Sequence, residues 1–258
     1  MSCGQKYALV TGASRGLGKE IAMELASRGI PCLLTSSTEK IHAVKDEITD
    51  LYHTECHSFV VDLANEDEVL EWCGKIAARY NIYILVNNVG TGGSCALENA
   101  TMDYLLRILH INILCTTILT KSLLSDLKRN APAYIMNIGS MAGFTPTAYK
   151  TVYPASKAFV HAFTLGLREE LRGTGVSVTL AAPGAMATNP EVCSRIKRQG
   201  LFGRATLKPT PEIARQYVNG MLRGKRTLIL NPLGYILSKF IPERWRIILL
   251  SHIVKREL

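Results

Sequence analysis

Two side chains able to move a proton stand four residues apart in the segment Tyr153-Pro154-Ala155-Ser156-Lys157. On a helix this spacing places Tyr153 and Lys157 on one face. A phenol has a reference pKa of about 10 and is a weak base at neutral pH. A neighbouring ammonium favours the phenolate and lowers that pKa. The pair therefore suits proton transfer to or from a carbinol oxygen, although the same spacing is common on exposed helices.

A glycine cluster, Thr11-Gly12-Ala13-Ser14-Arg15-Gly16-Leu17-Gly18, separates a strand-like run from a helix-like one. Glycines let a backbone turn tightly and approach a pyrophosphate closely, and the following helix offers free N–H groups and a partial positive charge. The position in the first strand-to-helix turn is the context that dinucleotide binding requires. The alternative is an ordinary tight turn.

The end of the second predicted strand bears on the choice between NAD and NADP. An acidic residue there would bind the ribose 2′-hydroxyl and repel a 2′-phosphate. This strand instead ends in Thr35-Ser36-Ser37-Thr38, with no acid before Glu39. Arg15 is able to add a charged donor to a phosphate. Both features favour NADP(H), without excluding NAD(H), and leave open that Arg15 is a surface residue without a contact.

Polar residues also follow two other strand-like runs. Ser140 comes directly after Ile138-Gly139, and Asn87-Asn88-Val89-Gly90 closes another run. Ligands of α/β sheets bind at the carboxyl ends of the strands. We therefore expect the Ser140 hydroxyl to reach the reacting oxygen and the second motif to line the cofactor.

The elements that must position these residues alternate along the chain. Short apolar runs predict strands, and the stretches with helical spacing between them predict helices. Such alternation indicates an α/β fold, a Rossmann-type doubly wound parallel sheet of about seven strands with helices on both faces. One domain over residues 1–258 is expected. The predicted strands are 7–11, 32–35, 57–61, 84–87, 134–138, 177–182 and 227–230, and the helices include 18–28, 38–53, 66–80, 102–129 and 153–172.

Taken in order, these motifs resemble those of the short-chain dehydrogenase/reductase family, in its 3-oxoacyl- and hydroxysteroid-reductase-like branch. The resemblance covers nearly the whole chain and implies a homodimer or homotetramer. It implies that Tyr153 is the general acid/base, that Ser140 positions the substrate oxygen, and that Lys157 binds the nicotinamide ribose. Asn112 resembles the asparagine that helps to hold a proton-relay water. The cofactor-binding residues implied are Gly12, Ser14, Arg15, Gly16, Leu17, Gly18, Ser36, Ser37, Asp62, Leu63, Asn88, Val89, Gly90, Tyr153, Lys157, Pro183, Gly184, Met186 and Thr188.

Three details depart from the family pattern. Val89 replaces a commoner alanine, and Ser37 stands where many NADP-preferring relatives carry arginine. Pro154 directly follows Tyr153, and proline disfavours helical geometry in the residue before it. Proline is tolerated in a first helical turn, so we expect the helix to begin near Tyr153.

Composition narrows the class of protein. A hydrophobic fraction of 47% supports a folded core. Seven cysteines without a paired framework indicate reduced thiols. The chain shows no secretion signal and no apolar stretch of about 18 residues, so a cytoplasmic location is expected. Six histidines show no metal-binding spacing, and His110 and His161 are interpreted as packing residues.

The positive charge belongs to the C-terminal quarter. Residues 195–258 hold 14 Lys/Arg against 3 Asp/Glu. This charge indicates a solvated surface, an anionic substrate carrier or an anionic membrane surface, and nucleic acid is not expected because no recognition motif accompanies it. Residues 185–211 are predicted to form a substrate lid. Residues 231–258 form a basic and apolar extension, suited to peripheral membrane contact, to covering a substrate tunnel or to an oligomer contact.

Together these features predict an NADP-dependent oxidoreductase that acts on a carbonyl or secondary alcohol, with a lipid-like or 3-oxoacyl compound as candidate substrate. The alternative is a non-catalytic NADP(H)-binding sensor or scaffold on the same fold, because a fold does not fix a function.

Overall fold

The computed structural model describes residues 4–184, 209–230 and 232–256. Seven strands form one parallel sheet in the order β3-β2-β1-β4-β5-β6-β7. The strands are β1 (Lys6–Thr11), β2 (Cys32–Ser36), β3 (Cys56–Val60), β4 (Asn81–Asn87), β5 (Ala133–Ile138), β6 (Val176–Ala182) and β7 (Thr227–Ile229). The predicted doubly wound α/β fold and its seven strands are confirmed, with strand ends shifted by up to three residues.

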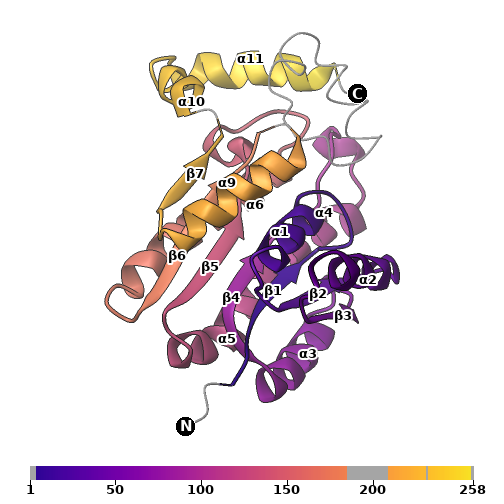
Figure 1. Ribbon diagram of the computed structural model, residues 1–258. Coiled ribbons are helices and arrows are strands. Elements are labelled where there is room, and N and C mark those ends of the chain that lie inside the picture. The colour runs from indigo at the N-terminus through magenta and orange to yellow at the C-terminus, as the bar shows by residue number, and fades with distance from the viewer. Residues whose placement is uncertain (1–3, 185–208, 231, 257–258) are drawn as a thin grey trace.

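Helices cover both faces of this sheet (Figure 1). On one face, α1 (Gly16–Ala26), α2 (Lys40–Tyr52) and α9 (Thr210–Leu222) bury residues such as Ile21, Ile48 and Tyr217. On the other, α3 (Glu66–Arg79), α5 (Cys115–Arg129) and α6 (Val152–Glu170) bury Trp72, Leu119 and Leu167. The central strands are apolar on both sides because both sides are covered.

The stretch predicted as one helix over 102–129 is interrupted. It consists of α4 (Met102–Leu109), a π-helical turn (His110–Leu114) and α5. By length and composition alone, the run Met102–Arg129 would be able to cross a membrane, which differs from the expectation that the chain has no such stretch. In the structure, 44% of its most apolar 18-residue window is buried inside the protein. Much of that burial comes from α5, which packs on β4 and α3.

The C-terminal extension contains α10 (Pro232–Lys239) and α11 (Glu243–Lys255). Both lie at the top of Figure 1, beyond the carboxyl end of β7. The predicted lid over 185–211, with Met186 and Thr188, lies almost entirely outside the described residues. The five cysteines that the structure describes are free, and burial raises the thiol pKa of Cys73 to about 11 and of Cys115 to about 12.

Candidate active site

From β1 the chain adds β2 and β3 on one side of the sheet, then crosses back to place β4 on the other side of β1. The order in which strands are added therefore reverses between β1 and β4. In open α/β sheets, ligands bind at the carboxyl ends of the strands beside such a reversal. The glycine loop follows β1 and Asn88 follows β4, so the topology brings these two predicted segments to the same crevice.

Direct hydrogen bonds join the two segments. The Asn88 side-chain amide donates to the carbonyl oxygens of Thr11 (2.8 Å) and Gly12 (3.2 Å). The Thr11 hydroxyl in turn accepts from the backbone N–H groups of Asn88 (3.0 Å) and Val89 (3.1 Å). The Asn88 amide thus holds the shape of the glycine loop, whereas the sequence had indicated only that it lines the cofactor.

The glycine loop fits a pyrophosphate. Gly12 and Gly16 have φ angles of 65° and 58°, a region that favours glycine. A methyl group at Gly18 would overlap both the Asn88 amide and the Gly12 carbonyl oxygen. Arg15, the N-cap residue of α1, makes no side-chain cap hydrogen bond, and the first turn of α1 holds no acid, whereas Asn65 caps α3 and three acids follow it. The α1 N-terminus therefore leaves its positive end to an anion.

Polar side chains stand at the ends of β2 and β3, where the sequence predicts that the adenosine binds, and Asp62 is the one acid among the residues predicted there. Ser36 is buried at the end of β2, where its hydroxyl accepts from the Thr38 N–H (3.2 Å), and Ser37 and Arg15 are exposed. Asp62 turns its carboxylate to the Ala64 N–H (3.1 Å), which fixes the turn after β3, and Leu63 is buried beside it. Arg15 belongs to the glycine loop itself. Ser36 and Ser37 lie at the carboxyl end of β2, which is next to β1 in the sheet, and Asp62 and Leu63 follow β3, one strand further out.

The segment of residues 90–93 lies against three of the predicted catalytic residues. A methyl group at Gly90 would lie 3.1 Å from the Lys157 Nζ and 3.4 Å from the Asn112 Oδ1, and one at Gly92 would overlap the Tyr153 ring. One backbone segment therefore brings Tyr153, Lys157 and Asn112 together, as the sequence predicts.

Tyr153 and Lys157 lie in the first turns of α6. This helix begins at Val152, so Pro154 falls in the first turn, where its missing N–H costs no helical hydrogen bond. The Lys157 ammonium donates to the Ile138 carbonyl oxygen (2.9 Å) and is only 4% exposed. Burial lowers the pKa of Lys157 to about 8, so at neutral pH the side chain still carries its charge.

The Asn112 side chain holds the loop rather than pointing into open space. Its amide donates to the Thr91 carbonyl oxygen (2.9 Å) and the Ser156 hydroxyl (2.9 Å), and its oxygen accepts from the Thr91 N–H (2.9 Å). Asn112 stands within the π-helical turn and is 1% exposed. The turn thus orients a polar side chain that fixes residue 91 between Gly90 and Gly92.

Ser140 follows β5, and its hydroxyl accepts from the Ala142 N–H (3.1 Å) at the start of the short helix η3 (Met141–Phe144). The Met141 N–H donates to the Pro183 carbonyl oxygen (2.9 Å), which places the predicted Pro183-Gly184 segment beside this loop.

His161 is a residue of the site that the sequence analysis interprets only as packing. Its Nε2 accepts from the Ser140 backbone N–H (3.4 Å), and a methyl group at Gly139 or Gly143 would lie 2.6 Å from its ring. Tyr153, Lys157 and His161 are spaced four residues apart, so they follow one face of α6. That repeated spacing is the sequence signal from which His161 can be identified as the third residue on this face of α6.

Burial and, to a smaller extent, the Lys157 charge lower the pKa of His161 to about 4. The ordinary value is 6.5, so between pH 4 and 6.5 the unfolded chain binds a proton that folded His161 does not. Stability should therefore fall as the pH falls through this window. Relative to His161→Gln, which keeps an acceptor but does not titrate, we expect the wild-type Tm to drop more between pH 7 and pH 4.5. A difference in Tm that is independent of pH would contradict this.

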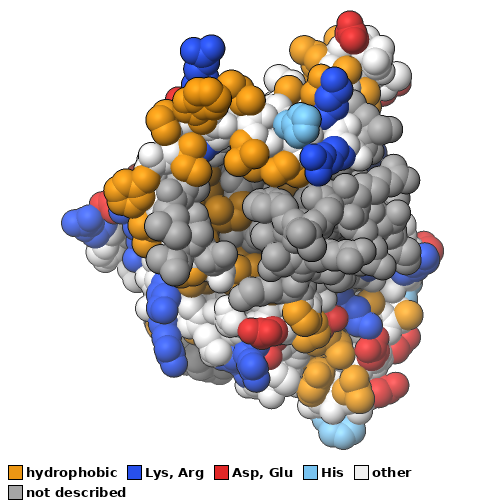
Figure 2. All heavy atoms as spheres, turned by 90° about the horizontal axis from the view of Figure 1, so that it is seen from above, with side chains coloured by type: hydrophobic (Ala, Val, Ile, Leu, Met, Phe, Trp, Pro, Cys, Tyr) orange, Lys and Arg blue, Asp and Glu red, His pale blue; other side chains and the backbone are white. Residues whose placement is uncertain are grey.

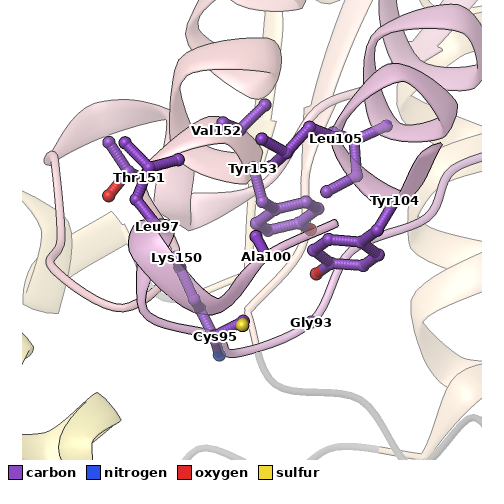
Figure 3. Close-up of a pocket in the computed structure, with 11 residues that line it drawn as sticks. Gly93, Cys95, Leu97, Ala100, Tyr104, Leu105, Lys150, Thr151, Val152 and Tyr153 are labelled. Carbon is purple, nitrogen blue, oxygen red and sulfur yellow. The ribbon is translucent and has the colours of Figure 1, made fainter. Parts of the chain in front are cut away.

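A second phenol lies beside Tyr153. Figure 3 shows the Tyr104 and Tyr153 rings next to each other at one side of a pocket, with Leu97 and Cys95 across from them. A methyl group at Gly93 would lie 2.8 Å from the Tyr104 hydroxyl oxygen. Apolar side chains dominate the rest of the pocket. The lining residues are Gly93, Cys95, Leu97, Ala100, Tyr104, Leu105, Ile108, Lys150, Thr151, Val152 and Tyr153.

Comparison with known proteins gives the family. The family model described as short chain dehydrogenase matches residues 6–197. The chain belongs to the short-chain dehydrogenase family. It is 36% identical over 185 residues to an uncharacterized oxidoreductase of Staphylococcus saprophyticus, covering 71% of this chain and 79% of that protein.

Other members of the family extend the comparison. The very-long-chain 3-oxoacyl-CoA reductase of Anas platyrhynchos is 34% identical over 211 residues, and the match covers 80% of this chain but only 65% of the length of that relative. Among solved structures, a short-chain dehydrogenase from Sphingobium yanoikuyae in complex with NADPH has a TM-score of 0.78 at 26% identity, covering 87% of each chain. One from Burkholderia cenocepacia in complex with NADP has a TM-score of 0.75 at 25% identity, covering 87% and 96% of the chains.

Proposed function

We propose that this short-chain dehydrogenase interconverts a carbonyl compound and a secondary alcohol with NADP(H), and that Tyr153 carries the proton. The observation that supports this most is the arrangement on α6. A phenol packs against Gly92 at the sheet crevice, one turn before a buried lysine that lies against Gly90.

The chain would hold the cofactor across the crevice between β1 and β4. Residues 12–18 would bind the pyrophosphate at the α1 N-terminus, and the segment 88–90 with Lys157 would face the nicotinamide ribose. The bound cofactor would supply or accept the hydride.

The proton would move through the chain's own groups. In reduction, the Tyr153 hydroxyl would donate to the developing alkoxide, while Ser140 would hydrogen-bond the same oxygen. The Lys157 charge would stabilise the phenolate left on Tyr153 and lower its pKa. His161 would position Ser140 through the backbone of residue 140, and Asn112 would position Thr91.

The side chains of the pocket beside Tyr153 suit a substrate with an apolar group next to the carbonyl, although its cavity of about 10 Å³ would have to open to admit one. Leu97, Leu105, Ile108 and Val152 line it, and such surface gains free energy by burying hydrocarbon. Relatives named as very-long-chain 3-oxoacyl-CoA reductases make 3-oxoacyl thioesters the first compounds to test. The experiment is a screen of NADPH and NADH oxidation across ketones and 3-oxoacyl thioesters. Cofactor binding without oxidation of any of them would favour a non-catalytic sensor.

The preference for NADP(H) is proposed from Arg15, Ser36 and Ser37, and Arg15 provides its test. We expect Arg15→Ala to lower the ratio of kcat/KM for NADPH over NADH by roughly tenfold or more, since a hydrogen bond to a charged group contributes about 1.5–3 kcal/mol. Lys19→Ala is the matched control, because this nearby cation on α1 pairs with Glu47 (2.6 Å). An unchanged ratio in Arg15→Ala would remove Arg15 from the proposal.

A further inference from the structure

The outer surface of α10 and α11 is apolar where a solvated helix would be polar. Thirteen large hydrophobic side chains are exposed in the described part of the chain, and six of them fall within the fourteen residues from 236 to 249. We call these six the apolar face. They are Ile236 (53% exposed), Phe240 (80%), Ile241 (40%), Trp245 (62%), Ile248 (49%) and Leu249 (55%).

The contacts of α11 fix which side looks outward. Trp245, Ile248 and Leu249 are spaced three and four residues apart, so they lie on one side of the helix. On the other side, the Ser251 hydroxyl accepts from the Ala148 N–H (2.9 Å) and Val254 is buried. The apolar face therefore points away from the body of the protein in the docked position of the helix.

Basic side chains surround this apolar face. Lys239, Arg244, Lys255 and Arg256 are exposed, and residues 232–256 contain five Lys/Arg against the single acid Glu243. Figure 2 shows hydrophobic and basic side chains gathered together on the side of the molecule seen from above, where α10 and α11 lie in Figure 1. Trp245 and Phe240 add aromatic rings, of which Trp is enriched at membrane–water interfaces.

We propose that α10 and α11 dock this protein on an anionic membrane surface, with the apolar face in the acyl–headgroup boundary and the flanking cations among lipid phosphates. The inner side of α11 packs on the protein, and its exposed side carries Trp, Ile and Leu beside Lys/Arg, which is the set of residues that helices lying in the plane of the membrane interface present to lipid. With 13 residues, α11 is about 20 Å long, shorter than the roughly 30 Å needed to span the bilayer.

The charge favours a membrane over a second copy of the chain. A two-fold contact through this surface would bring the same cations together from both copies of the chain. An anionic bilayer instead attracts each cation while it buries the apolar face. This inference does not depend on the catalytic proposal, because it uses only the surface of the extension.

Co-sedimentation with vesicles tests the proposal. We expect the protein to pellet with vesicles of phosphatidylcholine plus phosphatidylserine, to bind much less to phosphatidylcholine alone, and to be released in part by high salt. Trp245 provides a second readout, since the only other tryptophan, Trp72, is 7% exposed and already in an apolar environment. The fluorescence emission of Trp245 should shift to shorter wavelength when the protein binds the vesicles.

Two matched variants make the test specific. Leu249 is 55% exposed on α11 and Leu70 is 51% exposed on α3. We expect Leu249→Glu to weaken vesicle binding roughly tenfold or more, the loss for one leucine no longer buried, and Leu70→Glu to bind as the wild type does. Far-UV circular dichroism checks that both fold.

Two outcomes would overturn the proposal. One is that the wild type does not bind the vesicles, or that Leu249→Glu and Leu70→Glu bind them equally well. The other is a change in oligomeric state with Leu249→Glu, by size-exclusion chromatography, without any vesicle binding by the wild type. That result would assign the apolar face to a second copy of the chain.

Discussion

Tyr153→Phe should bind NADPH with nearly wild-type affinity and lose turnover by roughly 10²–10⁴-fold, the usual contribution of a general acid or base. The substitution removes the hydroxyl and keeps the ring that packs against Gly92. The loop over residues 90–93 and the glycine loop should therefore stay in place. The measurements are kcat with the best substrate of the screen and NADPH affinity by fluorescence titration.

Tyr149→Phe is the control for this experiment. It makes the same change four residues earlier, at a residue with a φ of 63° whose carbonyl oxygen accepts from the Cys95 N–H (2.6 Å). That backbone contact survives the loss of the hydroxyl, so activity should be retained. Full activity in Tyr153→Phe, or an equal loss in both variants, would contradict the role proposed for Tyr153.

Gly18→Ala should weaken cofactor binding roughly tenfold or more, because it would displace backbone N–H groups whose hydrogen bonds to a charged phosphate contribute about 1.5–3 kcal/mol. The added methyl group would overlap the Gly12 carbonyl oxygen, which belongs to the backbone and cannot rotate away. It would also displace the Asn88 amide from its bonds to residues 11 and 12. Overpacking of this kind costs about 1–3 kcal/mol of stability as well.

Gly74→Ala separates this effect from a general sensitivity to larger side chains. Gly74 lies on α3 with nothing within 4 Å of an added methyl group. Alanine in a helix is favoured over glycine by about 0.8–1.0 kcal/mol, so this variant should be slightly more stable and bind NADPH normally. The paired measurements are isothermal titration with NADPH and the free energy of unfolding in urea. Normal NADPH affinity in Gly18→Ala would contradict the placement of the cofactor at this loop.

Much of the fold follows from local pattern. The seven strands are short, mostly apolar runs of three to seven residues. The glycine loop can be recognised from its place between the first strand and the first helix. The pair of Tyr153 and Lys157 can be predicted from the sequence because its spacing of four residues matches one helical turn. These features depend on neighbours in the sequence, so the sequence alone suffices for them.

Other parts depend on residues far apart in the chain. The Asn88 amide bonds to carbonyl oxygens 76 and 77 residues away, and His161 meets Ser140 across 21 residues. Tyr104 lines the pocket with its hydroxyl against Gly93, where an added methyl group would lie 2.8 Å from it. No local propensity encodes such contacts. The predicted lid, with Met186 and Thr188, lies almost entirely outside the described residues and stays a prediction.

The π-helical turn at His110–Leu114 sets the rotation between α4 and α5. A π-turn carries one residue more than the α-turn that it replaces, and such bulges are frequent at functional sites. A chain one residue shorter there would form an unbroken α-helix, with its two halves turned by about 100° relative to each other. Asn112 would then lose its alignment with Thr91 and Ser156. The irregular turn thus sets the register that the hydrogen bonds of Asn112 require, and a regular helix would aim this side chain elsewhere.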